Sequence, residues 1–210
     1  MSKSKSVASL PLSCECGQVQ GAMKKGSSCY VVCYCGCCQA MLKYLDKEQL
    51  MDAEGGVHQH MCAPGAVTFT QGEAHIRSIK LSEKTGTVRW YADCCKTPIG
   101  ATAEDIPTGY VLFMFKDFIS KSADPADVAT FMGPIGMRCF AGASKKDTSQ
   151  LANPKPTKDS SWLMSLFWKI IKCSTGWRFQ GTIGPVPFFE KGTKKHISTP
   201  VVVDLGTTGH

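Results

Sequence analysis

The sequence predicts a mainly β fold with a short helix and an extended arm near the C-terminus. Three observations favour this class: the apolar and β-branched segments are short, glycine-containing turns separate most of them, and helical periodicity is scarce. With 43% hydrophobic and 20% charged residues, the 210-residue chain has the composition of a folded protein rather than a disordered one.

The expected strands follow one another through the first 115 residues. They are residues 17–23, 29–33, 66–70, 75–81, 88–92 and 110–115. Gln71-Gly72 and Lys84-Thr85-Gly86 supply turns on either side of 75–81, which favours hairpin connections there. The last segment is a continuous apolar run, which is typical of a buried strand.

Helices are expected at three places. A single turn is expected over 47–51, and a second helix over 125–131, where Asp124 can cap the helix and Pro125 can occupy its first position. The third is expected over 162–172 and should end before Gly176. Because apolar residues nearly surround it, we expect it to pack on the β domain or on a protein partner or second copy; a membrane-surface helix is the alternative.

The composition changes after Cys139, which predicts two regions. We expect a cysteine-rich β domain over residues 1–143 and an extension over residues 144–210, made of a polar linker, the helix and an extended arm. The N-terminal segment MSKSKSVASLPL has no apolar core of signal-peptide length, and we expect a tail there.

The bulk numbers limit the possible partners and the compartment. A net charge of +7 favours an anionic partner but selects no class, and we expect no specific nucleic acid. No apolar run reaches the ~20 residues that a bilayer needs, so no transmembrane segment is expected. Because no secretory signal is recognised, the twelve cysteines should be reduced, in the cytoplasm or another reducing compartment.

One group of cysteines is expected to bind zinc through Cys14 and Cys16. They lie on a tight turn that ends in Gly17, and a disulfide between residues so close would be strained. Two thiolates supply half of a tetrahedral zinc site, and the adjacent pair Cys94 and Cys95 is the best source of the rest. Cys95 is the expected third ligand; Cys94 is either the fourth, if the chain turns there, or a small buried hydrophobe.

A second group contains Cys33, Cys35 and Cys38 in a C-x-C-x-x-C pattern. Three protein ligands with an open fourth position are the pattern of a catalytic zinc. If Cys37 or one of the two histidines, His58 and His60, closed the site, the ion would be structural. Copper(I) and iron–sulfur clusters are the alternatives to zinc.

The order of these motifs resembles the glutathione-dependent formaldehyde-activating and centromere protein V family. The matching elements are C-x-C-G-x-V at 14–19, C-x-C-x-x-C at 33–38 and cysteine-Thr-Pro-aliphatic at 95–99, within roughly residues 12–120. The resemblance implies a β-tent fold of packed antiparallel sheets, a structural zinc, and a second zinc that meets the sulfur of glutathione. It also implies condensation of glutathione with formaldehyde, the reverse of a carbon–sulfur lyase reaction.

Carried onto this sequence, the resemblance makes Cys14, Cys16 and Cys95 the structural ligands. The catalytic ligands would be Cys33, Cys35 and Cys38, giving one or two zinc ions per chain and glutathione as a co-substrate.

The chain departs from the family, whose structural site ends in C-x-x-C-G: the first of these cysteines falls on Ala92, and the glycine falls on Lys96. Cys94 could compensate. The expected function is therefore a zinc-thiolate enzyme of the carbon–sulfur lyase type, and the alternatives are a non-catalytic zinc-stapled module that docks a protein partner through residues 162–172 and a redox or metal-buffering protein.

Overall fold

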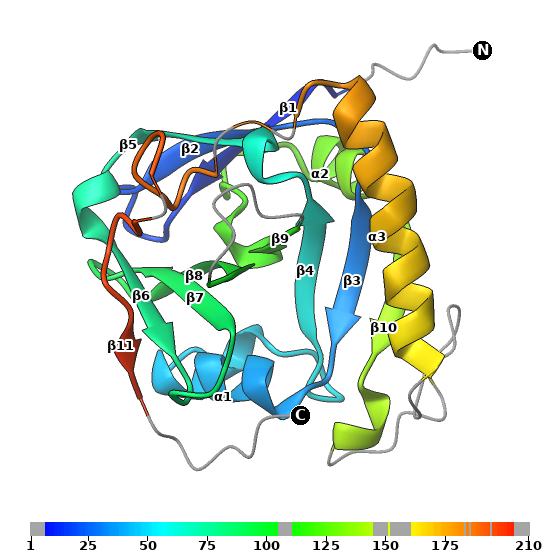
Figure 1. Cartoon of the computed structure of the whole chain (residues 1–210), viewed down its shortest axis with the longest axis horizontal. Coiled ribbons are helices and arrows are strands. Elements are labelled where there is room, and N and C mark those ends of the chain that lie inside the picture. The colour runs from blue at the N-terminus through cyan, green and yellow to red at the C-terminus, as the bar shows by residue number, and fades with distance from the viewer. Residues whose placement is uncertain are drawn as a thin grey trace.

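The computed structural model describes residues 7–104, 111–144, 151, 161–182, 184, 186–193 and 195–203. In this part of the chain two β-sheets lie against each other, with helices at the edges and on the outer face of the larger sheet (Figure 1). The predicted mainly β class with a C-terminal helix is confirmed. No described helix is both long and apolar enough to cross a bilayer.

The larger sheet has eight strands. In spatial order they are β10 (Ile135–Cys139), β3 (Cys29–Cys33), β4 (Val57–Cys62), β9 (Leu112–Phe115), β8 (Thr97–Ala103), β7 (Thr87–Ala92), β6 (Ile76–Lys80) and β11 (Val201–Val202). The six central strands pair antiparallel, as expected. The edge pairs β10–β3 and β11–β6 are parallel, and each joins segments far apart in the chain, as the long crossover of a parallel pair requires.

The smaller sheet contains three antiparallel strands in the order β1–β2–β5. Their bounds are Ser9–Ser13, Gln20–Lys24 and Val67–Gln71. Residues 9–13 were expected in a tail, and this expectation is wrong. Leu10 and Leu12 alternate with exposed neighbours and bury their side chains, so the segment has the period-2 pattern of a half-buried strand.

Three α-helices are described: α1 (Gly36–Tyr44), α2 (Pro125–Met132) and α3 (Ser161–Phe179). The Asp124 carboxylate accepts hydrogen bonds from the backbone N–H groups of Ala126 and Asp127, which is the predicted cap of α2. Helix α3 does not end before Gly176 as expected but continues through it. Short 3₁₀ turns occupy Glu48–Leu50, Pro64–Ala66, Glu73–His75, Lys116–Phe118 and Ala141–Ala143.

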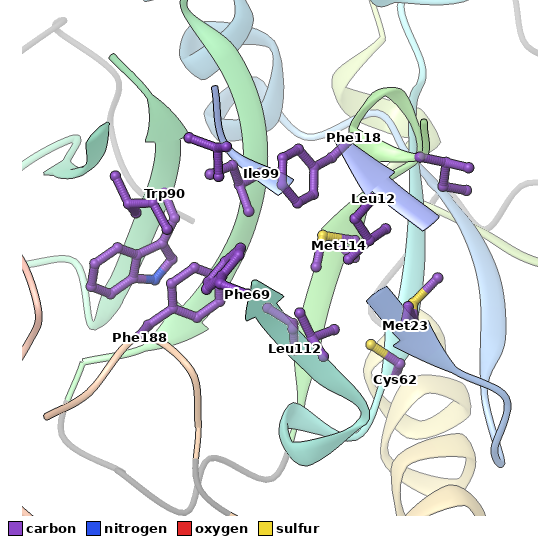
Figure 2. Close-up of a cluster of buried hydrophobic side chains, with 14 of the residues drawn as sticks. Leu12, Met23, Cys62, Phe69, Trp90, Ile99, Leu112, Met114, Phe118 and Phe188 are labelled. Carbon is purple, nitrogen blue, oxygen red and sulfur yellow. The ribbon is translucent and has the colours of Figure 1, made fainter. Parts of the chain in front are cut away.

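The main hydrophobic core lies between the two sheets (Figure 2). Trp90 of β7 stacks on Phe188 with ring centroids 4.6 Å apart, and Phe69 of β5 meets Phe188 edge-on at 5.4 Å. Val186 and Phe189 are also buried in this core. The C-terminal arm therefore contributes side chains to the core of the β domain. The expected division at residues 143 and 144 stays a prediction, and most of the expected linker, 145–150 and 152–160, lies outside the described residues.

The opposite face of the large sheet carries α1 and α3. Helix α3 lies along β3 and β10 (Figure 1), where Cys173 and Trp177 are buried and the Trp177 indole N–H donates to the Ser27 carbonyl. The helix therefore packs on the β domain, one of the two expected arrangements. On the other side of the helix, Met164 and Trp168 are each 62% exposed.

A buried histidine makes the fold sensitive to acid. His60 is only 1% exposed and packs beside the Phe131 ring, and burial lowers its pKa to about 4. In the unfolded chain its pKa is about 6.5, so as the pH falls from about 6.5 to about 4 the unfolded chain takes up the proton first. The proton uptake of the unfolded chain at this histidine should therefore lower the free energy of unfolding by about 3 kcal/mol as the pH falls from about 6.5 to about 4.

We expect His60→Leu to lose less stability than the wild type between pH 7 and pH 4.5. Urea unfolding at a series of pH values, with zinc in excess, measures the difference. The exposed His75→Leu serves as the matched control and should follow the wild type. Equal acid sensitivity in the wild type and His60→Leu would contradict the burial argument.

Candidate metal centres

The first thiol cluster forms where two turns of the chain meet. Cys14 follows β1, and Gly17, with φ +77°, lets the chain turn back toward β2. Cys94 and Cys95 occupy the tight turn between β7 and β8, which Lys96 helps to close with φ +58°. Adjacent residues point to opposite sides of a strand, but on this turn both sulfurs face Cys14. The chain therefore turns at Cys94, which is the condition under which Cys94 was expected to be the fourth ligand.

The four sulfurs of Cys14, Cys16, Cys94 and Cys95 have the spacing of a tetrahedral metal site. The sulfur of Cys14 lies 3.6 Å from that of Cys16 and 3.8 Å from that of Cys94, and the Cys16 and Cys94 sulfurs are 3.3 Å apart. All four lie within 4.8 Å of one another. Bonds of about 2.3 Å from zinc to sulfur place the corners of a tetrahedron about 3.8 Å apart. The cluster is therefore able to hold a metal ion with little rearrangement.

Hydrogen bonds favour the thiolate form of Cys95, whereas burial raises the pKa of Cys14 despite the bond that its sulfur accepts. The Val19 N–H donates to the Cys14 sulfur at 3.2 Å, and the Thr97 hydroxyl lies 3.1 Å from the Cys95 sulfur. Burial alone would raise the pKa of Cys95, but the Thr97 hydroxyl and the backbone N–H groups of Cys16 and Thr97 lower it to about 6. Such contacts orient metal ligands in thiolate sites.

The second cluster lies where β3 ends and α1 begins. The sulfurs of Cys33, Cys35 and Cys38 lie within 4.8 Å of one another. Cys35 is the N-cap of α1, and its sulfur accepts a hydrogen bond from the Cys38 N–H at 3.3 Å. The positive end of the helix therefore faces the cluster, which favours negative sulfur ligands there.

Proximity and burial keep these three thiols protonated unless a cation is bound. The neighbouring Cys139 thiol, the Cys35 thiol and burial raise the pKa of Cys33 well above the ordinary value. The Cys33 thiol and burial likewise raise the pKa of Cys38. A metal ion bound here would displace the thiol protons and offset the repulsion among three thiolates.

None of the residues that could have closed the second cluster belongs to its group of three sulfurs. Cys37 lies close by, on the wall of the adjoining cavity, and packs beside the core under α1. The His58 ring bonds to the Tyr30 hydroxyl at 2.6 Å, and His60 packs among the residues of the other face of the sheet. The side chain that β4 presents to the cysteines is Gln59 instead, whose amide N–H donates to the Cys38 sulfur at 3.5 Å.

A cavity of about 280 Å³ borders the second cluster. Its walls include the three cysteines, Gln59, Arg89 and Leu166 of α3. Sequence reasoning missed both polar residues. It also gave Cys139 no place in either cluster, although β10 pairs it directly with Cys33. Alternation along β7, which turns Trp90 into the main core, could have indicated that Arg89 faces the other side.

All twelve cysteines belong to the described residues, and all are free thiols. Thiols gathered into two groups without disulfides are suited to binding a metal ion. The two clusters could therefore bind metal, as the sequence predicts, whereas the identity of the ion and the role of each ligand stay predictions.

Comparisons with known proteins identify the family of the chain, and they assign no activity to that family. One solved structure, a crystal structure of a Rhodobacter sphaeroides protein, is 12% identical; the match covers 60% of this chain and 97% of the other, with a TM-score of 0.41. No curated protein matches. A family model, described as a family of unknown function (DUF6151), matches residues 3–198. The chain therefore belongs to the DUF6151 family.

Proposed function

We propose that the chain is a zinc-thiolate protein whose two sites have different roles. The cluster of Cys14, Cys16, Cys94 and Cys95 supplies all four ligands of a structural zinc. The cluster of Cys33, Cys35 and Cys38 supplies three and leaves the fourth position to an exogenous thiol. The observation that carries the proposal is the cavity beside the three-thiol cluster, since the two histidines and Cys37 do not close it.

The proposed reaction joins a thiol to a small aldehyde. Zinc bound at such a site lowers the pKa of a thiol ligand and so supplies a thiolate at neutral pH. The sulfur then attacks the carbonyl carbon, a carbon–sulfur bond forms, and the proton lost by the thiol goes to the carbonyl oxygen. The reverse is a carbon–sulfur lyase reaction. The motif order shared with the glutathione-dependent formaldehyde-activating family supports this choice, with glutathione as the expected thiol and a reducing compartment as the setting.

A second candidate function is a zinc-stapled module that docks a protein partner. The outward side of α3 favours it, since Met164, Phe167 and Trp168 are each more than half exposed in the described structure. Exposed apolar side chains gathered on one helix are common at protein interfaces. In this case the three-thiol cluster would hold zinc without binding any further thiol.

Thiol binding to the cobalt-substituted protein separates the two candidates. Cobalt(II) adopts the same ligands as zinc, and its visible spectrum responds when a new sulfur enters the coordination sphere. We expect glutathione to change the wild-type spectrum and Cys38→Ser to weaken this response more than tenfold, because the site loses a thiolate ligand. Cys29→Ser is the matched control: Cys29 is a half-buried thiol at the start of β3, outside both clusters and outside the lining of the cavity, and the variant should respond like the wild type.

The melting temperature of each variant shows whether the fold survives. If cobalt fills both sites and no thiol changes the wild-type spectrum, the three-thiol cluster has no open coordination position. This result would favour the docking module. An equal response of Cys38→Ser and Cys29→Ser would show that the thiol binds somewhere else.

A further inference from the structure

Arg89 brings a buried positive charge to the cavity beside the three-thiol cluster. The residue lies on β7, lines the cavity and is only 6% exposed. Its Nη1 atom is fully buried without a hydrogen-bond partner, and no carboxylate of the described residues forms an ion pair with it. A guanidinium stays protonated in proteins, and a buried charge without a partner is strongly unfavourable. Such a group indicates a missing anion.

The position of the guanidinium relates it to the metal centre. Arg89 and the three cysteines Cys33, Cys35 and Cys38 line the same cavity. Three thiolates and a divalent ion carry a net charge of about −1, which a nearby cation would offset. A planar guanidinium also pairs with a carboxylate through two parallel hydrogen bonds. The ammonium of a lysine, which acts as a point charge, does not provide this geometry.

The other walls of the cavity suit a hydrocarbon spacer. Val31, Phe113 and Met137 line it, and the other polar side chains on its described walls are Gln59, Thr85, Thr87 and the thiols of Cys37 and Cys139. The volume of about 280 Å³ equals that of roughly nine water molecules in the liquid. This volume lies at the lower end of the range usual for small-molecule sites, which favours a compact molecule.

We propose that this cavity binds a small thiol carrying a carboxylate, with the sulfur at the three-thiolate centre and the carboxylate at Arg89. The inference rests on the proposed function and specifies its substrate class. Glutathione belongs to the same chemical class, but the cavity favours a shorter molecule in which a few carbon atoms separate the sulfur from the carboxylate.

Two probes of equal size test the proposal. The carboxylate of 3-mercaptopropionate and the neutral amide of 3-mercaptopropanamide differ in charge while sharing the thiol and the spacer. Each is titrated into the cobalt-substituted protein. We expect the wild type to bind the carboxylate about 10 to 100 times more tightly, the difference typical of a hydrogen bond to a charged group. Glutathione should bind more weakly than 3-mercaptopropionate.

Arg89→Gln should remove the preference for the carboxylate and leave the affinity for the amide unchanged. Arg89→Lys keeps the charge without the planar guanidinium and should retain only part of the preference for the carboxylate. If Arg89→Gln loses its metal, the lysine variant tests the role of the guanidinium in its place. Arg77→Gln is the matched control: Arg77 is exposed on the neighbouring strand β6 and donates to the Ala74 and Ile76 carbonyls. This variant loses the same charge and should keep the full preference.

Four outcomes would overturn the inference. Equal binding of both probes by the wild type, or a preference that survives Arg89→Gln, would remove Arg89 as the carboxylate site and leave the open metal centre intact. Equal weakening of both probes by Arg89→Gln would show that the arginine only balances the charge of the centre. A cobalt spectrum that neither probe changes would overturn the proposed function itself, and the inference with it.

Discussion

Serine at Cys14 should lower the melting temperature of the protein by on the order of 10 °C or more. Cys14 is 3% exposed, and its sulfur lies within 4 Å of the Cys16 and Cys94 sulfurs. A closed four-thiolate zinc site contributes its binding energy directly to folding, about 10–16 kcal/mol in small zinc domains. Losing one of four ligands should forfeit several kcal/mol of this, and each lost kcal/mol lowers the melting temperature of a chain of this size by about 2–4 °C.

Cys37→Ser provides the control, since Cys37 is half-buried and lies outside both clusters. Thermal unfolding followed by circular dichroism, with and without a chelator, measures both effects. The chelator should destabilise the wild type and Cys37→Ser strongly and Cys14→Ser much less. If both serine variants melt alike and respond alike to the chelator, the four-thiol cluster is not a structural metal site.

The second large effect is expected at the aromatic stack of the main core. Phe188→Ala should destabilise the fold by about 3–5 kcal/mol, since it removes a fully buried ring and leaves a cavity beside Trp90 and Phe69. Phe179→Ala makes the same substitution at a ring that is 88% exposed, and its effect should stay within about 0.5 kcal/mol. Urea unfolding of the two variants and the wild type provides the comparison.

This pair of variants also tests the expected division of the chain. If Phe188→Ala is as mild as Phe179→Ala, the C-terminal arm adds little to the core and residues 144–210 form a separable extension. A large loss at Phe188 alone would mean that the β domain needs the arm to complete its core.

Local patterns predicted the strands that contain mostly β-branched or apolar residues. The expected strand 29–33 has the same bounds as β3, and 88–92 differs from β7 by one residue. Strand β4 was missed because the three consecutive residues His58, Gln59 and His60 are polar, although Gln59 and His60 are buried. Helix α1 was missed because a cysteine serves as its N-cap, where serine, threonine, aspartate and asparagine are the usual residues.

The second cysteine cluster and each half of the first could be predicted because close spacing along the chain limits the distances between thiols. The two halves of the first cluster were joined because Cys94 and Cys95 were the remaining adjacent pair. The cavity could not be predicted, since its residues meet only through sheet pairing. Gln59 and Arg89 come from strands β4 and β7, separated in the sheet by β9 and β8. Cys139 reaches Cys33 through a parallel pairing across more than a hundred residues, for which no local signal exists. The two histidines were plausible ligands by type, but strand alternation turns them away from the cluster.

The number of zinc ions bound per folded chain tests the central claim most directly. Elemental analysis of protein purified without added metal should find two zinc ions per chain in the wild type. Cys38→Ser should retain one, in the four-thiol cluster, and Cys37→Ser should retain both. One zinc or none in the wild type, or iron in place of zinc, would contradict the account of two zinc-thiolate centres.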